Sequence, residues 1–244
     1  MFAVPTSLTT WSKPAARSVV RGLALGALLL SLAAATIGLR APEPLADYTI
    51  VLVHVPAAWL SLLLYGAAVA AAVAALQSPA RLPEGTLAAI APVGAAAAIL
   101  ALWTGLASQQ AHGWWGWDAR LVCELLLLLL FAGLVALRRG IEEPDRAERA
   151  GAVLVLTGAL NIPIIYLSVD WWQTLHERAA ASVGRSPLVT GAMALMTMAF
   201  CMTAGALVLA RLQAFTRERE AGTRYFGSAR AEGGSARTPA KEQQ

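Results

Sequence analysis

Six apolar runs constrain the fold of this chain more than any other feature. Each is close to the roughly 20 residues that a helix needs to cross the hydrocarbon core of a bilayer. With 57% hydrophobic and 14% charged residues among 244, the chain is too apolar for an ordinary soluble domain. The sequence therefore predicts an all-α, polytopic membrane protein. The predicted spans are Val19–Ile37, Val51–Leu76, Leu87–Ser108, Leu121–Leu137, Val153–Val169 and Leu188–Leu212.

The first span is predicted to be a membrane helix and not a cleaved signal peptide. Its apolar run exceeds the about 7–15 residues of a signal-peptide core, and the following "LRAPEPLAD" offers no clear small-x-small cleavage site. We predict one six-helix transmembrane domain over residues 1–212. Beyond Leu212 the composition changes to Arg, Glu, Gly, Ser, Thr, Lys and Gln, which bury too little apolar surface to fold. Residues 213–244 are therefore predicted to form a flexible tail.

The basic residues predict the orientation of the six spans. The N-terminal segment, the second and fourth loops and the tail hold 15 Lys and Arg residues, against 4 in the opposite loops. Because cytoplasmic loops are enriched in these residues, both termini are predicted to lie in the cytoplasm. The segment from Arg138 to Arg149 is predicted to be a solvated cytoplasmic loop. The net charge of +4 follows from this topology and requires no nucleic-acid partner.

All three histidines are predicted to face the side opposite the termini. His54 lies at the outer end of the second span, His112 in the third loop and His176 in the fifth loop. Pro56 is predicted to occupy the first turn of the second span, where its missing N–H costs little. His54 would then sit at a helix N-terminus, which disfavours imidazolium and keeps the ring able to bind a metal. The alternative is that such a histidine is only an interfacial polar residue.

Tryptophans gather on the same side as the histidines. An interfacial belt would decorate both membrane faces, whereas the cytoplasmic ends carry only Trp11. Trp114 and Asp118 are four residues apart, as are Trp172 and His176, so each pair would share one face of a short helix. The pattern favours a recognition site over a plain belt. The outward tryptophans are Trp114, Trp115 and Trp117 of "GWWGWDAR", with Trp171 and Trp172.

Aromatic clusters, imidazoles and arginines at one membrane face suit a planar ligand that carries a metal and anionic groups. Haem has these properties, because porphyrin stacks on indole, iron accepts neutral imidazole and propionates pair with arginine. His54 and His176 come from different elements, as axial ligands on opposite faces of one ring must, and His112 is a reserve candidate. The arginines available for the propionates are Arg120, Arg178 and Arg185.

Three residue types within the spans complete the prediction. Cys123 and Cys201 form no C-x-x-C or C-x-x-C-H motif, so they are expected to be packing thiols and no covalent haem attachment is predicted. Glu124 would be costly in lipid and should face the bundle interior or the site. Pro92 and Pro163 either kink their helices or serve packing.

Four segments stand out between Tyr48 and Leu188. They are "HVPAAW", "WWGWDARL", "NIPIIYLSVDWWQTLHE" and "RSPL". These segments resemble the signature segments of the CcmC family, the haem-handling membrane proteins of bacterial cytochrome c maturation. The tryptophan-rich segment, about residues 108–120, is shared by a wider haem-handling superfamily, whereas the segment around His176 is more specific.

The chain departs from the family pattern at the edge of the tryptophan-rich segment. The pattern usually reads W-G-T-W-W-x-W-D, and this chain has "AHGWWGWD". Ala111 therefore replaces a tryptophan, and Val122 and Cys123 replace a Thr-Ser pair before the glutamate. These changes put contacts at that rim in doubt, but not the two histidine positions.

The resemblance implies a b-type haem held non-covalently on the periplasmic side of the cytoplasmic (inner) membrane, as a ligand to be transported. Its axial ligands by motif are His54 and His176. The haem would pass to the chaperone CcmE, with CcmD and the CcmA–CcmB transporter as partners. The chain has no Walker motif, so it is not predicted to be the ATPase or another enzyme. The remaining implied site residues are Trp114, Trp115, Trp117, Asp118, Arg120, Trp171 and Trp172.

Two other functions remain open from the residues alone. A b-type membrane cytochrome in quinol electron transfer would typically need ligands for two haems stacked across the bilayer, and no histidine is predicted in the inner half. A transporter subunit could instead use its tryptophans to anchor itself or to bind a partner. In that case the purified protein would hold no haem.

Overall fold

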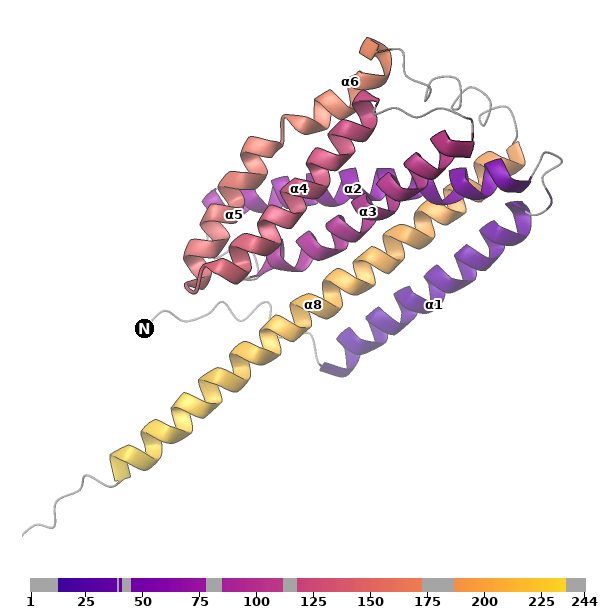
Figure 1. The fold of residues 1–244 in the computed structure, drawn as a ribbon. Coiled ribbons are helices and arrows are strands. Elements are labelled where there is room, and N and C mark those ends of the chain that lie inside the picture. Colours follow the sequence, from indigo (N-terminus) through magenta and orange to yellow (C-terminus); the bar gives the residue numbers. More distant parts are fainter. Residues whose placement is uncertain are drawn as a thin grey trace, which may run out of the picture.

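The computed structural model of the chain describes residues 13–38, 40, 45–77, 85–111, 118–172 and 187–235. Over these ranges the regular structure is entirely helical, and six stretches are long and apolar enough to cross a membrane. The predicted all-α architecture with six spans is confirmed (Figure 1). The helices are α1 (Lys13–Gly38), α2 (Leu45–Gln77), α3 (Thr86–Ala111), α4 (Ala119–Gly140), α5 (Pro144–Gly158), α6 (Asn161–Trp172) and α8 (Pro187–Ser235).

The helices α2, α3, α4 and α5 form the centre of the bundle, and α6 extends α5 along α4. The helix α8 packs against α2 and α3, whereas α1 lies along α8 at the edge and barely touches α2 (Figure 1). The bundle end at which α2 begins and α3 ends is called the outer end below. The starts of α4 and α8 and the end of α6 lie at this same end (Figure 1).

The main core lies deep in the bundle, where small residues let the helices approach closely. The rings of Tyr65 and Phe131 meet edge to face, with centroids 5.4 Å apart and planes at 83°. Gly94 of α3 faces the Phe131 ring so closely that a β-carbon there would collide with it. The alanines that surround these rings are Ala68, Ala71, Ala72, Ala91 and Ala152.

The fifth span is broken in its middle, which the sequence did not specify. Pro163 has no N–H to donate to the Ala159 carbonyl, so the helix cannot continue regularly through this point. Instead Ile162 N–H donates to the Ala159 carbonyl at 3.1 Å, and α6 starts at Asn161 after a turn at residues 159–160. Tyr65 of α2 donates its hydroxyl proton to the Val155 carbonyl at 3.0 Å, so this carbonyl near the end of α5 has a hydrogen-bond partner.

Two predicted boundaries differ from the structure. The segment Arg138–Arg149 was predicted to be a loop, but α5 starts at Pro144, a residue suited to a first helical turn, and only residues 141–143 link the helices. The helix α8 does not end at Leu212 but continues to Ser235 (Figure 1). The residues directly after Leu212, "QAFTREREA", are mostly strong helix formers, which favours continuation of the helix past the apolar run. The predicted flexibility of the tail stays a prediction.

The inner end of the bundle, opposite the outer end, is held by contacts to α8 and α5. The Arg138 guanidinium lies 5.9 Å from the centroid of the Phe215 ring, in a cation–π contact. Gly85 adopts a positive φ of 83° directly beside that ring, a backbone conformation that glycine takes without strain. The Glu148 carboxylate accepts the N–H of Leu87 at 3.4 Å in the first turn of α3.

Candidate functional site

His54 is placed on α2, but not where the sequence predicted. The helix begins at Leu45, so His54 is its tenth residue and Pro56 lies inside the helix. The expected helix N-terminus at His54 is therefore wrong, because the helix starts six residues before Val51, where the apolar run was predicted to begin. A helix N-terminus therefore does not explain a neutral imidazole at this residue.

Hydrogen bonds to α3 define which nitrogen of the His54 ring carries the proton. Its Nδ1 lies 3.0 Å from the Ala101 carbonyl oxygen and 3.1 Å from Thr104 Oγ1, both on α3. A carbonyl oxygen can only accept, so Nδ1 carries the proton and donates it. Thr104 donates its own proton to the Leu100 carbonyl at 2.7 Å, which leaves its oxygen free to accept. A neutral imidazole that donates from Nδ1 keeps its lone pair on Nε2, the nitrogen that can bind a metal.

Gly105 makes room for this ring. A β-carbon at this position would lie 3.0 Å from His54 Cε1 and 2.9 Å from Leu121 Cδ2. The imidazole thus lies beside Gly105 of α3, which also faces Leu121 in the first turn of α4. We call this place the His54 seat. Thr104 and Gly105 were not predicted to be site residues, because a single threonine and a single glycine inside an apolar run form no pattern that indicates a ligand site.

Asp118 and Arg120 lie where the tryptophan-rich segment joins α4. Asp118 is buried and extended (φ −82°, ψ 162°), and its Oδ1 accepts the Leu121 N–H at 2.8 Å as the N-cap of the helix. Arg120 is half-buried in the first turn of α4. The cap holds the last residue of the tryptophan-rich segment in a fixed place at the outer end, close to Leu121 and hence to the His54 seat.

The other predicted site residues fall outside the described part of the chain. Residues 112–117 and 173–186 are not described, and the side chains of Trp171 and Trp172 are not described although their backbone belongs to α6. The helix ends that flank both segments lie at the same end of the bundle as His54 (Figure 1). The two predicted i, i+4 pairs stay predictions. The residues outside are His112, Trp114, Trp115, Trp117, His176, Arg178 and Arg185.

Buried polar side chains occupy the bundle just beneath this site. Glu124 is only 5% exposed, and its Oε1 accepts the hydroxyl proton of the fully buried Ser61 at 2.7 Å. The prediction that Glu124 faces the interior is confirmed. Asn161 donates through Nδ2 to the Cys123 carbonyl at 3.0 Å and so ties the broken fifth span to α4. Ser61 lies seven residues after His54 on the same face of α2, a spacing that could have identified it.

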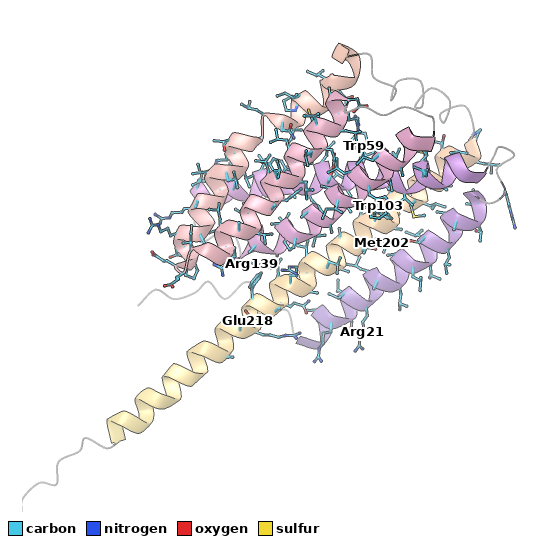
Figure 2. All side chains as sticks on the ribbon, viewed as in Figure 1. Arg21, Trp59, Trp103, Arg139, Met202 and Glu218 are labelled. Carbon is cyan, nitrogen blue, oxygen red and sulfur yellow. The ribbon has the colours of Figure 1, made fainter. Side chains whose placement is uncertain are left out.

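The thiols and the tryptophans inside the spans play no part in this cluster. Cys123 is buried and Cys201 half-buried, and both are free thiols, as predicted for packing residues. Trp59 and Trp103 lie on the outside of the bundle, 46% and 73% exposed (Figure 2). Over the described residues, no three His, Cys, Asp or Glu side chains gather to hold a bare metal ion. Axial binding to haem iron needs only single imidazoles.

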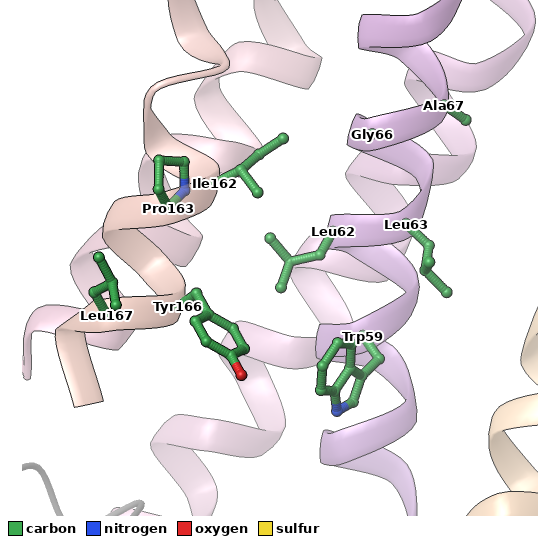
Figure 3. Close-up of a pocket in the computed structure, with 9 residues that line it drawn as sticks. All are labelled: Trp59, Leu62, Leu63, Gly66, Ala67, Ile162, Pro163, Tyr166 and Leu167. Carbon is green, nitrogen blue, oxygen red and sulfur yellow. The ribbon is translucent and has the colours of Figure 1, made fainter. Parts of the chain in front are cut away.

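A groove of about 700 Å³ lies between α2 and α6, beside the break in the fifth span (Figure 3). Trp59 and Tyr166 face each other across its opening, and Pro163 lines its wall. It does not include His54 and is almost entirely apolar, so it offers no metal ligand. The other lining residues are Leu62, Leu63, Gly66, Ala67, Ile162 and Leu167.

Comparison with known proteins identifies the family. The family model of CcmC, heme exporter protein C, matches residues 1–226. Heme exporter protein C of Bradyrhizobium diazoefficiens is 47% identical over 137 residues, 55% of this chain and 52% of that protein. The Escherichia coli K12 protein of the same name is 43% identical over 133 residues, 54% of each chain. The match thus spans about half the length of these relatives. The chain belongs to the heme exporter protein C family, as its motifs predicted.

Proposed function

We propose that this member of the heme exporter protein C family handles haem for cytochrome c maturation. It holds haem at the outer end of the bundle, with His54 as an axial ligand, and passes it to a periplasmic chaperone. The proposal is supported by the family match over residues 1–226 and by the names of the relatives, which are heme exporters. The haem is cargo and not a resident cofactor, so it must be bound reversibly.

The observation that carries the proposal is the hydrogen bond from His54 Nδ1–H to the Ala101 carbonyl. Histidines that bind metals usually donate their second ring N–H to a carbonyl or carboxylate, which fixes both the tautomer and the ring orientation. At His54 this arrangement puts the metal-binding lone pair on Nε2 without any metal being needed to create it. Thr104 Oγ1 reinforces the same tautomer. The donor chemistry of the site therefore fits haem iron.

The neighbouring elements supply the other features that haem requires. The Asp118 cap fixes the first turn of α4, which follows directly on the tryptophan-rich segment, and α6 leads from the buried Asn161 to Trp171 and Trp172. We propose that these indole rings stack on the porphyrin and that His176 binds the opposite face of the iron. Arg120, Arg178 and Arg185 are the candidates for the propionates.

A carrier must release its cargo, so we propose non-covalent b-type binding with one porphyrin edge left exposed. A chaperone such as CcmE could then reach a vinyl group while the histidines hold the iron. CcmD and the CcmA–CcmB transporter are the further proposed partners, with ATP hydrolysis assigned to the transporter because this chain has no Walker motif. The chain itself acts as a non-enzymatic membrane subunit.

We further propose that the outer end faces the periplasm and that both termini lie in the cytoplasm, in the bacterial inner membrane. Arginines support this orientation, because Arg138 and Arg139 end α4 at the inner end of the bundle (Figure 2). Arg146 and Arg149 follow in α5 at the same end. The outer loops carry few basic residues by comparison.

The test is the absorption spectrum of the purified protein, recorded oxidised and reduced. Wild type is expected to show the bands of a low-spin haem with two imidazole ligands. His54→Ala and His176→Ala should each lose haem or shift it to a high-spin spectrum, and His112→Ala, at the reserve candidate, should leave the spectrum unchanged because His54 and His176 are the proposed ligands. Added imidazole should restore the low-spin bands to His54→Gly. The proposal would be refuted if the double variant His54→Ala/His176→Ala kept the wild-type spectrum and the wild-type transfer of haem to CcmE.

A further inference from the structure

The inner turns of α4 are oriented by the Phe131 ring, which fits against Gly94 of α3 and meets Tyr65 of α2 edge to face. Further out, six consecutive leucines, Leu125 to Leu130, cover every side of the helix for more than one turn. In a bilayer such a surface packs about equally well against lipid and against other helices. Apolar contact therefore orients the outer turns of α4 less sharply than the inner turns, although the outer turns follow directly on Asp118.

One polar contact holds the outer turns of α4 in place. The Ser61 hydroxyl of α2 lies 2.7 Å from Glu124 Oε1 of α4 and 2.8 Å from the Ala58 carbonyl, and it donates between these two acceptors. The helices α2 and α4 touch each other far less than either touches α3. The Ser61–Glu124 bond thus joins α2 and α4 about two helical turns of α4 outward from their ring contact between Tyr65 and Phe131.

The bond lies directly beneath the proposed haem site. Ser61 is seven residues, or about 10 Å at 1.5 Å per residue, from His54 on the same face of α2. Glu124 lies six residues from Asp118, whose cap ends the tryptophan-rich segment. One residue of rotation turns a helix by about 100°. If α4 turned by one residue, Asp118 would therefore move to another side of the helix axis.

We propose that Glu124 is a positioning residue for the haem site. Its bond to Ser61 holds the outer turns of α4 against α2, and so fixes where Asp118, the N-cap of α4, lies relative to the His54 imidazole. This inference rests on the proposed function. It also explains why a carboxyl group is kept at a membrane-embedded position, where it is costly and where a leucine would match its neighbours. Single buried polar residues fix helix register in the same way in coiled coils, at a cost in stability.

The alternative is that Glu124 acts by its charge, through Arg120 one turn earlier on the same helix. The two possibilities predict different results at one position. A glutamine keeps an oxygen that can accept the Ser61 proton but carries no charge. A leucine removes both the acceptor and the charge while suiting the leucine-rich helix.

The experiment is a hemin titration of the purified full-length protein in detergent, with the reduced absorption spectrum and the melting temperature recorded for each variant. Glu124→Leu and Ser61→Ala should each weaken haem binding about tenfold, the lower range for loss of an orienting contact at a metal site. The double variant should be no weaker than either single variant, because both remove the same bond. Glu124→Gln should stay close to wild type in affinity and spectrum. Tyr65→Phe, which removes a buried hydrogen bond deeper in the bundle, is the matched control and should leave haem affinity unchanged.

Each other outcome overturns the inference. Wild-type affinity in Glu124→Leu with a lowered melting temperature would show a purely structural role. An equal loss in Glu124→Gln and Glu124→Leu would show that charge acts and not the bond to Ser61. If wild type binds no hemin, the proposed function and this inference fail together. If wild type binds hemin and depends on His54, but Glu124→Leu and Ser61→Ala bind it as wild type does, only the positioning role is lost.

Discussion

The outer and inner halves of the bundle are held together by different means. Toward the outer end, side-chain hydrogen bonds run from His54 to α3, from Ser61 to Glu124 of α4 and from Asn161 to α4. Further in, Phe131 packs among leucines and alanines and meets the buried Tyr65 ring edge to face. Close packing predominates in this half, where side-chain hydrogen bonds join α5 to α2 and α3, whereas the directional bonds toward the outer end hold the site residues. The comparison indicates that stability comes chiefly from one half and the placement of site residues from the other.

The largest effect on stability is expected from the inner half. Phe131→Ala should lower the free energy of unfolding by about 3 kcal/mol, because a fully buried aromatic ring is replaced by a cavity. Haem affinity per folded molecule should stay unchanged, since Phe131 lies away from the outer end. Thermal unfolding in detergent and a hemin titration measure the two quantities. Loss of haem binding in protein that remains folded would break the separation of the two halves.

A smaller stability effect with a large effect on binding is expected at Gly105. A methyl group there would press on His54 and Leu121, so Gly105→Ala should cost about 1 kcal/mol of stability by overpacking. Haem affinity should fall clearly, because the imidazole must shift to make room. Gly66→Ala is the matched control, since a β-carbon at that glycine has nothing within 4 Å. Equal haem binding by the two variants would argue against the His54 seat.

The Asp118 cap is expected to contribute about 1 kcal/mol. Asp118→Ala leaves the Leu121 N–H without its side-chain acceptor, a typical cost for loss of an N-cap. Glu143, the N-cap residue of α5, makes no such bond. Glu143→Ala should therefore change the melting temperature much less, and comparable shifts in the two variants would contradict the capping role. Haem affinity should fall only in Asp118→Ala, where the tryptophan-rich segment loses its anchor.

The smallest effect is expected from Tyr65→Phe, which removes the hydrogen bond to the Val155 carbonyl and keeps the ring packed on Phe131. Hydrogen bonds between membrane helices contribute about 0.6 kcal/mol on average. The change should appear as a slightly lower melting temperature and faster amide hydrogen exchange in the last turn of α5. Faster exchange spread evenly over α4 would show instead that the bond supports the whole bundle.

The sequence predicted the six spans and the inward position of Glu124, and the structure confirms both. It did not predict the start of α2, because residues 45–50 are less apolar than the run that follows and gave no hydropathy signal. It also missed the break near Ala159. A proline inside an apolar run is compatible with a kink, a break or ordinary packing, and the outcome depends on whether a neighbour such as Tyr65 can satisfy the exposed carbonyl.

The thickness of the hydrocarbon core fixes the length of an apolar helix, so the sequence by itself determined how many times this chain crosses the membrane. Its motifs likewise indicated the family, since they are local patterns of residues. Only the tertiary structure decided which nitrogen of His54 carries the lone pair and what Glu124 binds. Those answers come from contacts between residues 47 and 63 positions apart, and no local pattern encodes which partner two packed helices bring within hydrogen-bonding distance.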